Sequence, residues 1–326
     1  MSERQIDGIE VPDVAAIERT QLALTPYIRS TPVFETVLPT GLDAVFKIEM
    51  LQVSGTFKAR GAFSNLLGLD GAQRAAGVTC ISAGNHAVAV AYAAMVLGIS
   101  AKVVMLATAN PARVALCRKF GADILIEPDG ASGFARVHKI EAEEGRYFVH
   151  PFNGYRTILG TATLGAEWAR QAGRLDAVVL PIGGGGLAAG VATAFRLLQP
   201  EIEIIGVEPV GAASMARSFV EGGPIKMGPM QSIADSLMAP HTEAYSYGLC
   251  HRAIDRLTMV DDTMIRGAMR FLFEELKLAI EPACAVATAA VFGPLRERLA
   301  GKRVGVLLCG SNTDAATFAK HIGNLA

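Results

Sequence analysis

The sequence pattern predicts that a buried strand is followed by a helix within the stretch Lys47-Ile48-Glu49-Met50-Leu51-Gln52-Val53-Ser54-Gly55-Thr56-Phe57-Lys58-Ala59-Arg60-Gly61-Ala62. The apolar run ends in a polar turn that carries Gly55, and a helical pattern begins at Lys58. A lysine at the start of a helix lies close to unpaired backbone N–H groups, and burial there lowers its pKa. A lysine that can lose its proton is a nucleophilic amine, able to form a Schiff base with an aldehyde cofactor. A single lysine at this position is more often an ordinary surface residue. The hydroxyls and the aromatic ring that precede Lys58 favour the chemical interpretation.

Composition limits the classes of partner. The chain has 326 residues, 51% of them hydrophobic, and its mean hydropathy is +0.34, so we expect one large or two medium domains with ample core. Thirty basic and 31 acidic residues leave no net charge to attract nucleic acid or an anionic membrane. The N-terminus is charged and shows no secretory signal. An uncharged run at 177–195 has the length of a membrane span, but its proline and four consecutive glycines favour a strand, a loop and a buried helix.

The cysteines indicate a reducing compartment. They are five in number, scattered, and never spaced as C-x-x-C: Cys80, Cys117, Cys250, Cys284 and Cys309. This pattern disfavours both a disulfide framework and a zinc site. We therefore expect a cytoplasmic protein without a bound metal ion.

Two series of alternating strands and helices follow the opening segment. In the first, apolar runs at 78–82, 102–106, 123–126 and 147–150 predict buried strands, and the patterns at 86–97, 111–120 and 132–144 predict helices. The second has strands at 177–180, 203–207 and 303–308 and helices at 158–171, 187–198, 262–276 and 283–299, with a short helix from residue 313. Alternation of this kind produces parallel sheets with helices on both faces. The predicted fold class is α/β, and residues 76–153 form a small domain.

Two loops between a strand and a helix carry candidate binding groups. Ser82-Ala83-Gly84-Asn85-His86-Ala87 offers unpaired backbone N–H groups at a helix N-terminus, which suit a carboxylate, although N-capping by Asn85 would also explain the pattern. Gly183-Gly184-Gly185-Gly186-Leu187 allows main-chain N–H groups to converge on a phosphate. The same loop fits a loose dinucleotide fingerprint, with Glu208 at the place of a ribose-binding acid. An NAD-dependent oxidoreductase is therefore an alternative function.

The lysine stretch and both loops together resemble the serine/threonine dehydratases, which are pyridoxal-phosphate (PLP) enzymes of the tryptophan-synthase-β-like fold, fold type II. The resemblance covers about residues 20 to 320, with Thr56 in place of the family's usual serine. It implies that Lys58 holds PLP and acts as catalytic base beside Phe57. It further implies that Ser82 to Ala87, with Ala83, Gly84 and His86, bind the substrate carboxylate, that Asn85 also bonds the PLP phenolic oxygen, and that Gly183 to Leu187 bind the phosphate.

Further cofactor contacts follow from the same resemblance. Cys309 falls on the position that faces the pyridine nitrogen, with Ser311 as the other candidate, and Asn153 approaches PLP from the turn at 150–153. Weaker matches are the stretches at 233–236 and 280–282. A cation site of some relatives falls on Glu208, Ala212 and Ser214, where the serine replaces a carboxylate, so no metal is expected.

The resemblance also implies an activity. It predicts a β-eliminating ammonia-lyase acting on a small amino acid, with serine and threonine as default substrates; 3-hydroxyaspartate and phenylserine share the reacting atoms. Racemases of the family carry a serine base at the position of Ala83, so alanine favours elimination over racemisation. Cysteine-synthase-type enzymes have Asn-Thr-Gly where this chain has Asn85-His86-Ala87, and Lys58 disfavours a non-catalytic regulator. Finally, the resemblance implies a homodimer, a large domain of residues 1–75 and 154–326, and PLP in the cleft between the two domains.

Overall fold

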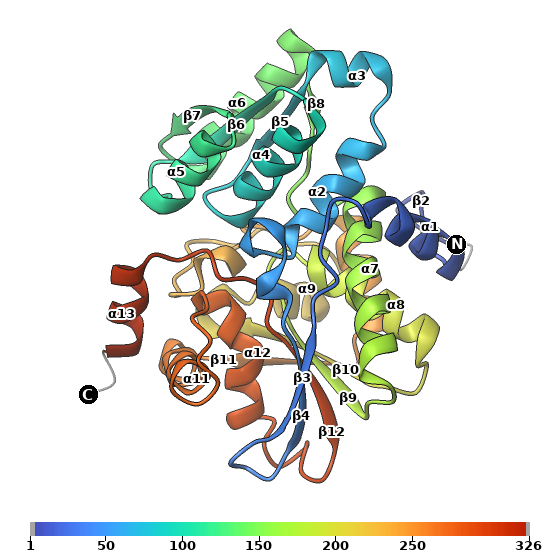
Figure 1. Ribbon diagram of the computed structural model, residues 1–326, viewed down its shortest axis with the longest axis vertical. Coiled ribbons are helices and arrows are strands. Elements are labelled where there is room, and N and C mark those ends of the chain that lie inside the picture. The colour runs from blue at the N-terminus through green and yellow to red at the C-terminus, as the bar shows by residue number, and fades with distance from the viewer. Residues whose placement is uncertain (1–3, 324–326) are drawn as a thin grey trace.

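The computed structural model describes residues 4–323, which form two sheets flanked by helices (Figure 1). The larger sheet has six strands in the order β11-β10-β9-β12-β4-β3, and the smaller has four in the order β7-β6-β5-β8. A two-stranded ribbon precedes them: β1 (Gln5–Ile6) and β2 (Ile9–Glu10). The fold class is therefore α/β, as the alternating sequence pattern predicts.

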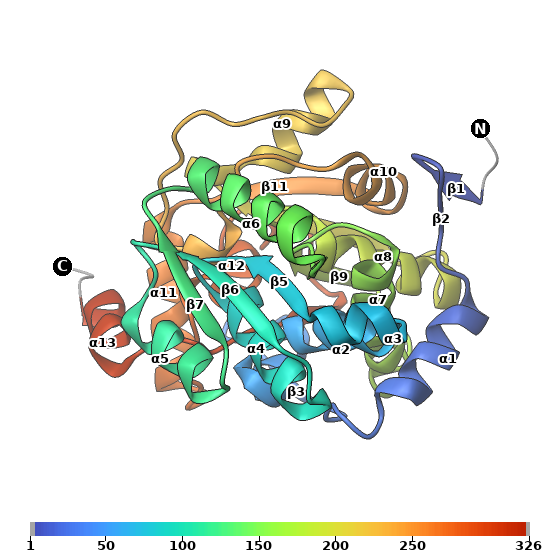
Figure 2. The same ribbon diagram turned by 90° about the horizontal axis from the view of Figure 1, so that it is seen from above.

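The smaller sheet is wholly parallel. Its strands are β5 (Val78–Ile81), β6 (Ala101–Leu106), β7 (Asp123–Glu127) and β8 (Tyr147–Phe148), joined by α4 (Asn85–Leu97), α5 (Pro111–Lys119) and α6 (Gly130–Glu144). Successive strand residues point to opposite faces. Accordingly, Cys80 packs in the cluster under α4 and α5, whereas Ile81 packs against Val137 of α6. Helices therefore cover both faces, with α6 on the opposite side from α4 and α5 (Figure 2).

The larger sheet is mixed, which corrects the expectation of two parallel sheets. Its strands are β3 (Val33–Val37), β4 (Asp43–Lys47), β9 (Ala177–Pro181), β10 (Glu203–Pro209), β11 (Arg256–Val260) and β12 (Arg303–Leu307). All neighbouring strands run parallel except β3 and β4 at the edge. The connection at 38–42 is too short for a crossover, so these two strands pair as an antiparallel hairpin.

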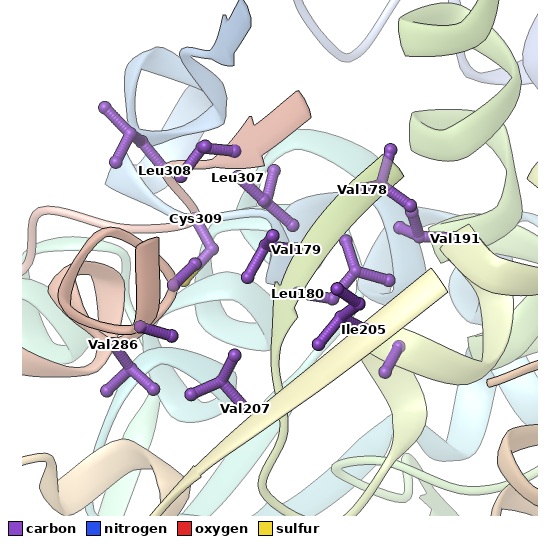
Figure 3. Packing of buried hydrophobic residues seen from close by; sticks show 14 of the residues in the cluster. Val178, Val179, Leu180, Val191, Ile205, Val207, Val286, Leu307, Leu308 and Cys309 are labelled. Atoms are coloured by element: carbon purple, nitrogen blue, oxygen red, sulfur yellow. The ribbon is translucent and has the colours of Figure 1, made fainter. Parts of the chain in front are cut away.

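Helices cover the larger sheet as well. They are α7 (Tyr155–Ala172), α8 (Gly186–Leu198), α9 (Ser214–Glu221), α10 (Ala244–Ala253), α11 (Asp262–Glu274), α12 (Pro282–Phe292) and α13 (Ala315–Gly323). Buried side chains of the parallel strands and of α12, among them Val179, Val207 and Val286, form one continuous core (Figure 3). The fully buried Trp168 on α7 meets Phe195 on α8 edge to face, with ring centroids 5.3 Å apart.

The helix that begins at Lys58, α2 (Lys58–Leu67), lies between the two sheets (Figure 1). Its apolar residues Ala59, Ala62, Phe63 and Leu66 belong to the same buried cluster as β5 and β6. Other positions of α2 contact α7 of the larger sheet, as Arg60 does through Glu167. The lysine helix is thus held by both halves of the molecule. Helices α1 (Val14–Leu24) and α3 (Gly71–Ala76) complete the N-terminal part.

Several boundaries differ from the sequence prediction. The helix expected at 283–299 ends at Phe292, because Gly293 and Pro294 follow and proline cannot continue a helix. Strand β11 and helices α3, α9 and α10 were not predicted, since they are short, with 5, 6, 8 and 10 residues respectively. The uncharged run at 177–195 forms β9, the glycine turn and most of α8. No helix within residues 4–323 is long and apolar enough to cross a membrane. All five cysteines are free and buried, which confirms that they form no disulfide framework.

Candidate active site

Lys58 is the first residue of α2, as the sequence predicts, and its side chain is half-buried. Its Nζ donates a hydrogen bond to the carbonyl oxygen of Pro151 and lies 5.1 Å from the centroid of the Phe57 ring. Burial lowers the pKa of Lys58 to about 8, against the opposite influence of Cys309 and Glu281. The amine is therefore neutral in a substantial fraction of molecules near physiological pH, as a nucleophile or base requires.

The turn before Lys58 is attached to the segment that follows β12. The N–H of Phe57 donates to the carbonyl oxygen of Cys309 at 3.0 Å, and the N–H of Ser311 donates to that of Gly55 at 2.9 Å. Gly55 has φ +70°, and a Cβ atom there would lie 2.5 Å from the Asn312 side chain. Glycine is therefore required at this position both by the backbone conformation and by the close approach of Asn312. Segments far apart in the sequence thus fix where Lys58 emerges.

The glycine loop lies opposite the lysine, and Gly186 lines the same small cavity as Lys58 and Phe57. The loop runs from the end of β9 to the start of α8, whose first N–H groups have no acceptor within the helix. A Cβ atom on Gly184 would lie 2.4 Å from the ring of Phe152, and one on Gly186 would lie 2.5 Å from its carbonyl oxygen. Phe152 therefore packs directly against the loop, which only glycine at both positions allows. The unpaired N–H groups at the start of α8 suit an anion.

The predicted carboxylate loop crosses from β5 to α4, where Gly84, not Asn85, is the N-cap residue. The side chain of Asn85 makes no cap bond; its amide donates to Glu281 Oε1 at 2.6 Å and its oxygen accepts from Asn312 at 2.8 Å. N-capping by Asn85, the alternative interpretation of this motif, is therefore wrong. The neighbouring His86 is buried, and its Nε2 is 2.8 Å from the carbonyl oxygen of Val149. Burial, and then Lys58, lower the pKa of His86 to about 3, so this ring is neutral.

Arg113 is a site residue that the sequence analysis missed. It lies on α5 beside the smaller sheet, yet its Nη1 is 2.6 Å from Asp235 and its Nη2 is 3.3 Å from Glu281. Both carboxylates belong to segments packed on the larger sheet, within the weak motif matches at 233–236 and 280–282. Burial raises the pKa of Glu281 to about 7, against the opposite pull of Arg113. Nothing in the sequence around Arg113 indicates this contact, because its partners lie more than 120 residues away.

Cys309 is buried directly after β12 within the core shown in Figure 3. A hydrogen bond with Cys284, together with burial, raises the pKa of the Cys309 thiol, so the thiol is neutral. Ser311 differs from it: its hydroxyl donates to the carbonyl oxygens of Met50 and Gly55 in the lysine turn, at 3.3 and 3.5 Å. Cys309 and Ser311, the two candidates for contact with the pyridine nitrogen, therefore have different hydrogen-bond partners.

Two other predicted residues have partners that the sequence does not indicate. Asn153 lies beside the glycine loop: its Oδ1 accepts from the N–H of Ser246, whose hydroxyl donates to Gly184 at 3.1 Å. The carboxylate of Glu208 is fully buried and accepts the N–H groups of Met215 and Ala216 at 2.8 and 2.7 Å, at the start of α9. Both oxygens of Glu208 are therefore engaged, which disfavours the ribose contact of the NAD alternative. Residues 4–323 contain no group of three or more His, Cys, Asp or Glu side chains arranged to hold a metal ion.

Comparison with known proteins identifies the cofactor. A family model described as pyridoxal-phosphate dependent enzyme matches residues 23–310. The chain belongs to this family. It is 66% identical over 323 residues to a phenylserine dehydratase of Ralstonia pickettii, covering 98% of this chain and 99% of that protein. It is 38% identical to a β-hydroxyaspartate dehydratase of Paracoccus denitrificans, covering 92% and 95% of the two chains. The structure of maize serine racemase superposes with a TM-score of 0.90 at 32% identity, covering 95% of this chain and 97% of that one.

The cofactor of this family member is PLP, and the residues present fit it. PLP combines an aldehyde, which a neutral lysine amine can attack, with a phosphate, which needs converging N–H donors. Lys58 and Gly186, the last glycine of the loop, line one cavity, and the first N–H groups of α8 beside it have no acceptor within the helix. The family match therefore confirms the resemblance to PLP-dependent enzymes that the lysine stretch and the two loops indicate.

Proposed function

We propose that this protein is a dehydratase that eliminates water from a β-hydroxy amino acid. The released enamine then takes up water and loses ammonia, which leaves a 2-keto acid. Two of its relatives, 66% and 38% identical, are named as dehydratases of phenylserine and β-hydroxyaspartate. The observation that carries the proposal is Lys58, whose Nζ shares a cavity with the glycine loop and whose pKa burial lowers to about 8. Phenylserine is our first candidate substrate because of the 66% identity. Serine and threonine are the second, because the lysine stretch and both loops resemble those of their dehydratases.

In this proposal the predicted residues share the work of binding the substrate, holding the cofactor and moving the proton. The substrate carboxylate binds at the N-terminus of α4, on Ser82 to Ala87, and Lys58 removes the proton from Cα. The cofactor, when bound, supplies the electron sink that makes this proton removable. The N–H groups at 183–187 hold its phosphate, and Phe57, Asn85 and Asn153 contact it. Cys309 is the better candidate for the pyridine nitrogen, because the hydroxyl of Ser311 is already bonded to the lysine turn.

Ala83 favours elimination over racemisation. A racemase needs an acid–base group on each face of the planar carbon that loses its proton, and Lys58 supplies one. Ala83 lies in the turn between β5 and α4 and has no group that exchanges a proton. We therefore expect the removed proton to return to the opposite face more slowly than the β-hydroxyl leaves.

The domain division, the assembly and the location complete the proposal. We propose that residues 76–153 are one domain and residues 1–75 and 154–326 another, each containing one of the two sheets. Helix α2 precedes residue 76 but packs in the same cluster as β5 and β6, so the boundary at residue 76 is the first to test. A homodimer is proposed from the family resemblance. A cytoplasmic location is favoured by five free, buried cysteines.

The function is tested by incubating the purified protein with phenylserine, serine, threonine and 3-hydroxyaspartate. We expect keto acid and ammonia in equal amounts, with little D-amino acid by chiral chromatography. Borohydride treatment followed by peptide mapping should find the cofactor fixed on Lys58. A modified lysine elsewhere would contradict the assignment of Lys58, and a D-amino acid formed faster than keto acid would contradict elimination as the main reaction.

A further inference from the structure

A groove of about 490 Å³ opens between α6 and the segment that connects α9 to α10. Aromatic side chains contribute half of its lining residues: Phe134, His138, Phe148, His150 and His241. They come from α6, from β8 and the turn that follows it, and from the segment after α9, so the groove exists only where both halves of the molecule meet. Figure 2 shows α6 on the same side of the molecule as α9. The volume lies in the range of small-molecule sites.

The rings contact one another around the groove. Phe134 meets His241 with ring centroids 5.9 Å apart, and Phe148 meets His150 at 5.6 Å. Phe152 contacts rings from both sides of the groove: its ring centroid lies 5.7 Å from that of His241 and 4.8 Å from that of His150. Except for the buried Phe152, these rings are half-buried, so each keeps part of its surface exposed. Edge-to-face and offset contacts at these separations are also available to another aromatic ring that enters the groove.

The groove adjoins the reacting amine through three consecutive residues. His150 lines the groove, the carbonyl oxygen of Pro151 accepts the hydrogen bond from Lys58, and Phe152 packs against the glycine loop. Neighbouring Cα atoms along a chain are about 3.8 Å apart. The groove therefore begins one residue away from the atom that Lys58 contacts. Pro151 lines the cavity of Lys58 and His150 lines the groove, so consecutive residues line the two.

The charges in the groove favour an uncharged occupant. Glu243 is bonded to His241 at 2.9 Å and lies 3.8 Å from His150, so its carboxylate already has partners. Burial, and then His241 and Lys58, lower the pKa of His150 to about 3, so that ring is neutral. Lys226 is exposed at the rim, and no arginine lines the groove in the part of the chain that the structure describes. A planar anion such as a second carboxylate has no bidentate partner here.

We propose that this groove binds the aryl side chain of an aromatic β-hydroxy amino acid, with Phe134 and His241 as its main contacts. The inference rests on the proposed function, since it places the side chain of the substrate that Lys58 deprotonates. Phe134 then determines specificity for aromatic substrates, because the short side chains of serine and threonine do not contact it.

The test compares Phe134→Ala and Phe134→Leu with wild type, each as holoenzyme. We expect kcat/KM for phenylserine to fall by about tenfold or more in Phe134→Ala, while kcat/KM for threonine changes by less than about twofold. Phe134→Leu keeps an apolar side chain of similar reach without the ring, and should lose selectivity while keeping the fold. Phe273→Ala is the matched control: Phe273 is also half-exposed and packs edge to face on Phe318 at 5.2 Å, but lies on α11 away from the groove. It should leave both substrates unaffected.

A binding measurement separates failure of this inference from failure of the proposed function. Calorimetric titration with L-phenylalanine and L-alanine, which have no β-hydroxyl to lose, needs no turnover. Weaker binding of phenylalanine but not of alanine to both Phe134 variants supports the groove even if no β-hydroxy amino acid is converted to keto acid. Unchanged phenylalanine binding, or an equal loss of kcat/KM for phenylserine and threonine, would overturn the inference while leaving dehydration intact.

Discussion

Arg60 and Arg113 each hold two carboxylates, but in different surroundings. Arg60 is fully buried on α2 and binds Glu49 at 2.7 Å and Glu167 at 3.0 Å. Arg113 binds Asp235 at 2.6 Å and Glu281 at 3.3 Å, and the side chain of Asp235 is 47% exposed. The first cluster ties the lysine helix to α7 beside the larger sheet. The second ties α5, beside the smaller sheet, to segments of the larger one.

The charge balance of the two clusters differs as well. Lys47 also bonds Glu167, so two cations face two carboxylates around Arg60. Burial alone would raise the pKa of Glu167, but Arg60 and Lys47 outweigh it and hold that pKa below its usual value. Around Arg113 one cation is shared by two carboxylates, and the pKa of Glu281 rises to about 7. The comparison indicates that the Arg60 cluster is a fixed part of the fold, whereas the Arg113 cluster can gain or lose a proton and open to solvent.

Replacing Arg60 should have the largest effect on stability. Arg60→Met leaves Glu49 and Glu167 buried with one cation between them, and we expect a loss of about 3–5 kcal/mol in the free energy of unfolding. Urea unfolding checks the value. Arg298→Met is the matched control, because Arg298 pairs with Glu203 at the surface, where a loss of at most about 1 kcal/mol is expected. Equal losses in the two variants would remove the distinction between a buried and a surface pair.

The raised pKa of Glu281 should be visible in the pH dependence of the free energy of unfolding. Between its unfolded pKa of 4.5 and its folded value of about 7, the folded state holds a proton that the unfolded state has lost. The free energy of unfolding therefore falls as pH rises through this window, by on the order of 3 kcal/mol for this group. Glu281→Gln should remove that part of the fall.

Urea unfolding at pH 5, 6 and 7 on cofactor-free protein provides the measurement. Burial also raises the pKa of Glu208, a buried carboxylate outside the cluster, to about 7, so Glu208→Gln should remove a comparable part of the fall. An identical pH profile for wild type and Glu281→Gln would contradict a protonated Glu281.

Replacing Arg113 should cost less than replacing Arg60. Asp235 is half-exposed, and Glu281 can take up a proton when its cation is removed. We expect Arg113→Met to lower the free energy of unfolding by about 1–2 kcal/mol. It should raise KM more than it lowers kcat, because Glu281, which accepts the amide of Asn85, loses the arginine that orients it. Arg113→Lys keeps one ion pair, so its KM should lie closer to that of wild type than to that of Arg113→Met. A stability loss as large as that of Arg60→Met would show that both clusters are equally fixed.

Local sequence was sufficient for the parts of the site that depend on neighbouring residues. The glycines at 183–186 predicted a strand-to-helix turn, and β9 and α8 confirm it; Gly185, with φ +93°, has a backbone that few other residues tolerate. Lys58 was predicted to begin a helix, and it does. The roles assigned to Asn153 and Cys309 stay predictions, since they depend on contacts with a bound cofactor.

By itself, the sequence determined the alternating α/β pattern, the lysine turn and the two strand-to-helix loops, since each depends on periodicity or on backbone preferences within about a dozen residues. Only the tertiary structure decided the antiparallel β3 edge, the partners of Arg113 and the aromatic groove. The residues that form these features are separated by many positions in the chain. Arg113 and Glu281, 168 positions apart, meet only because α5 and α12 pack on different sheets that face each other across the site. Burial and charge then fix their protonation, which depends on surroundings that no local pattern contains.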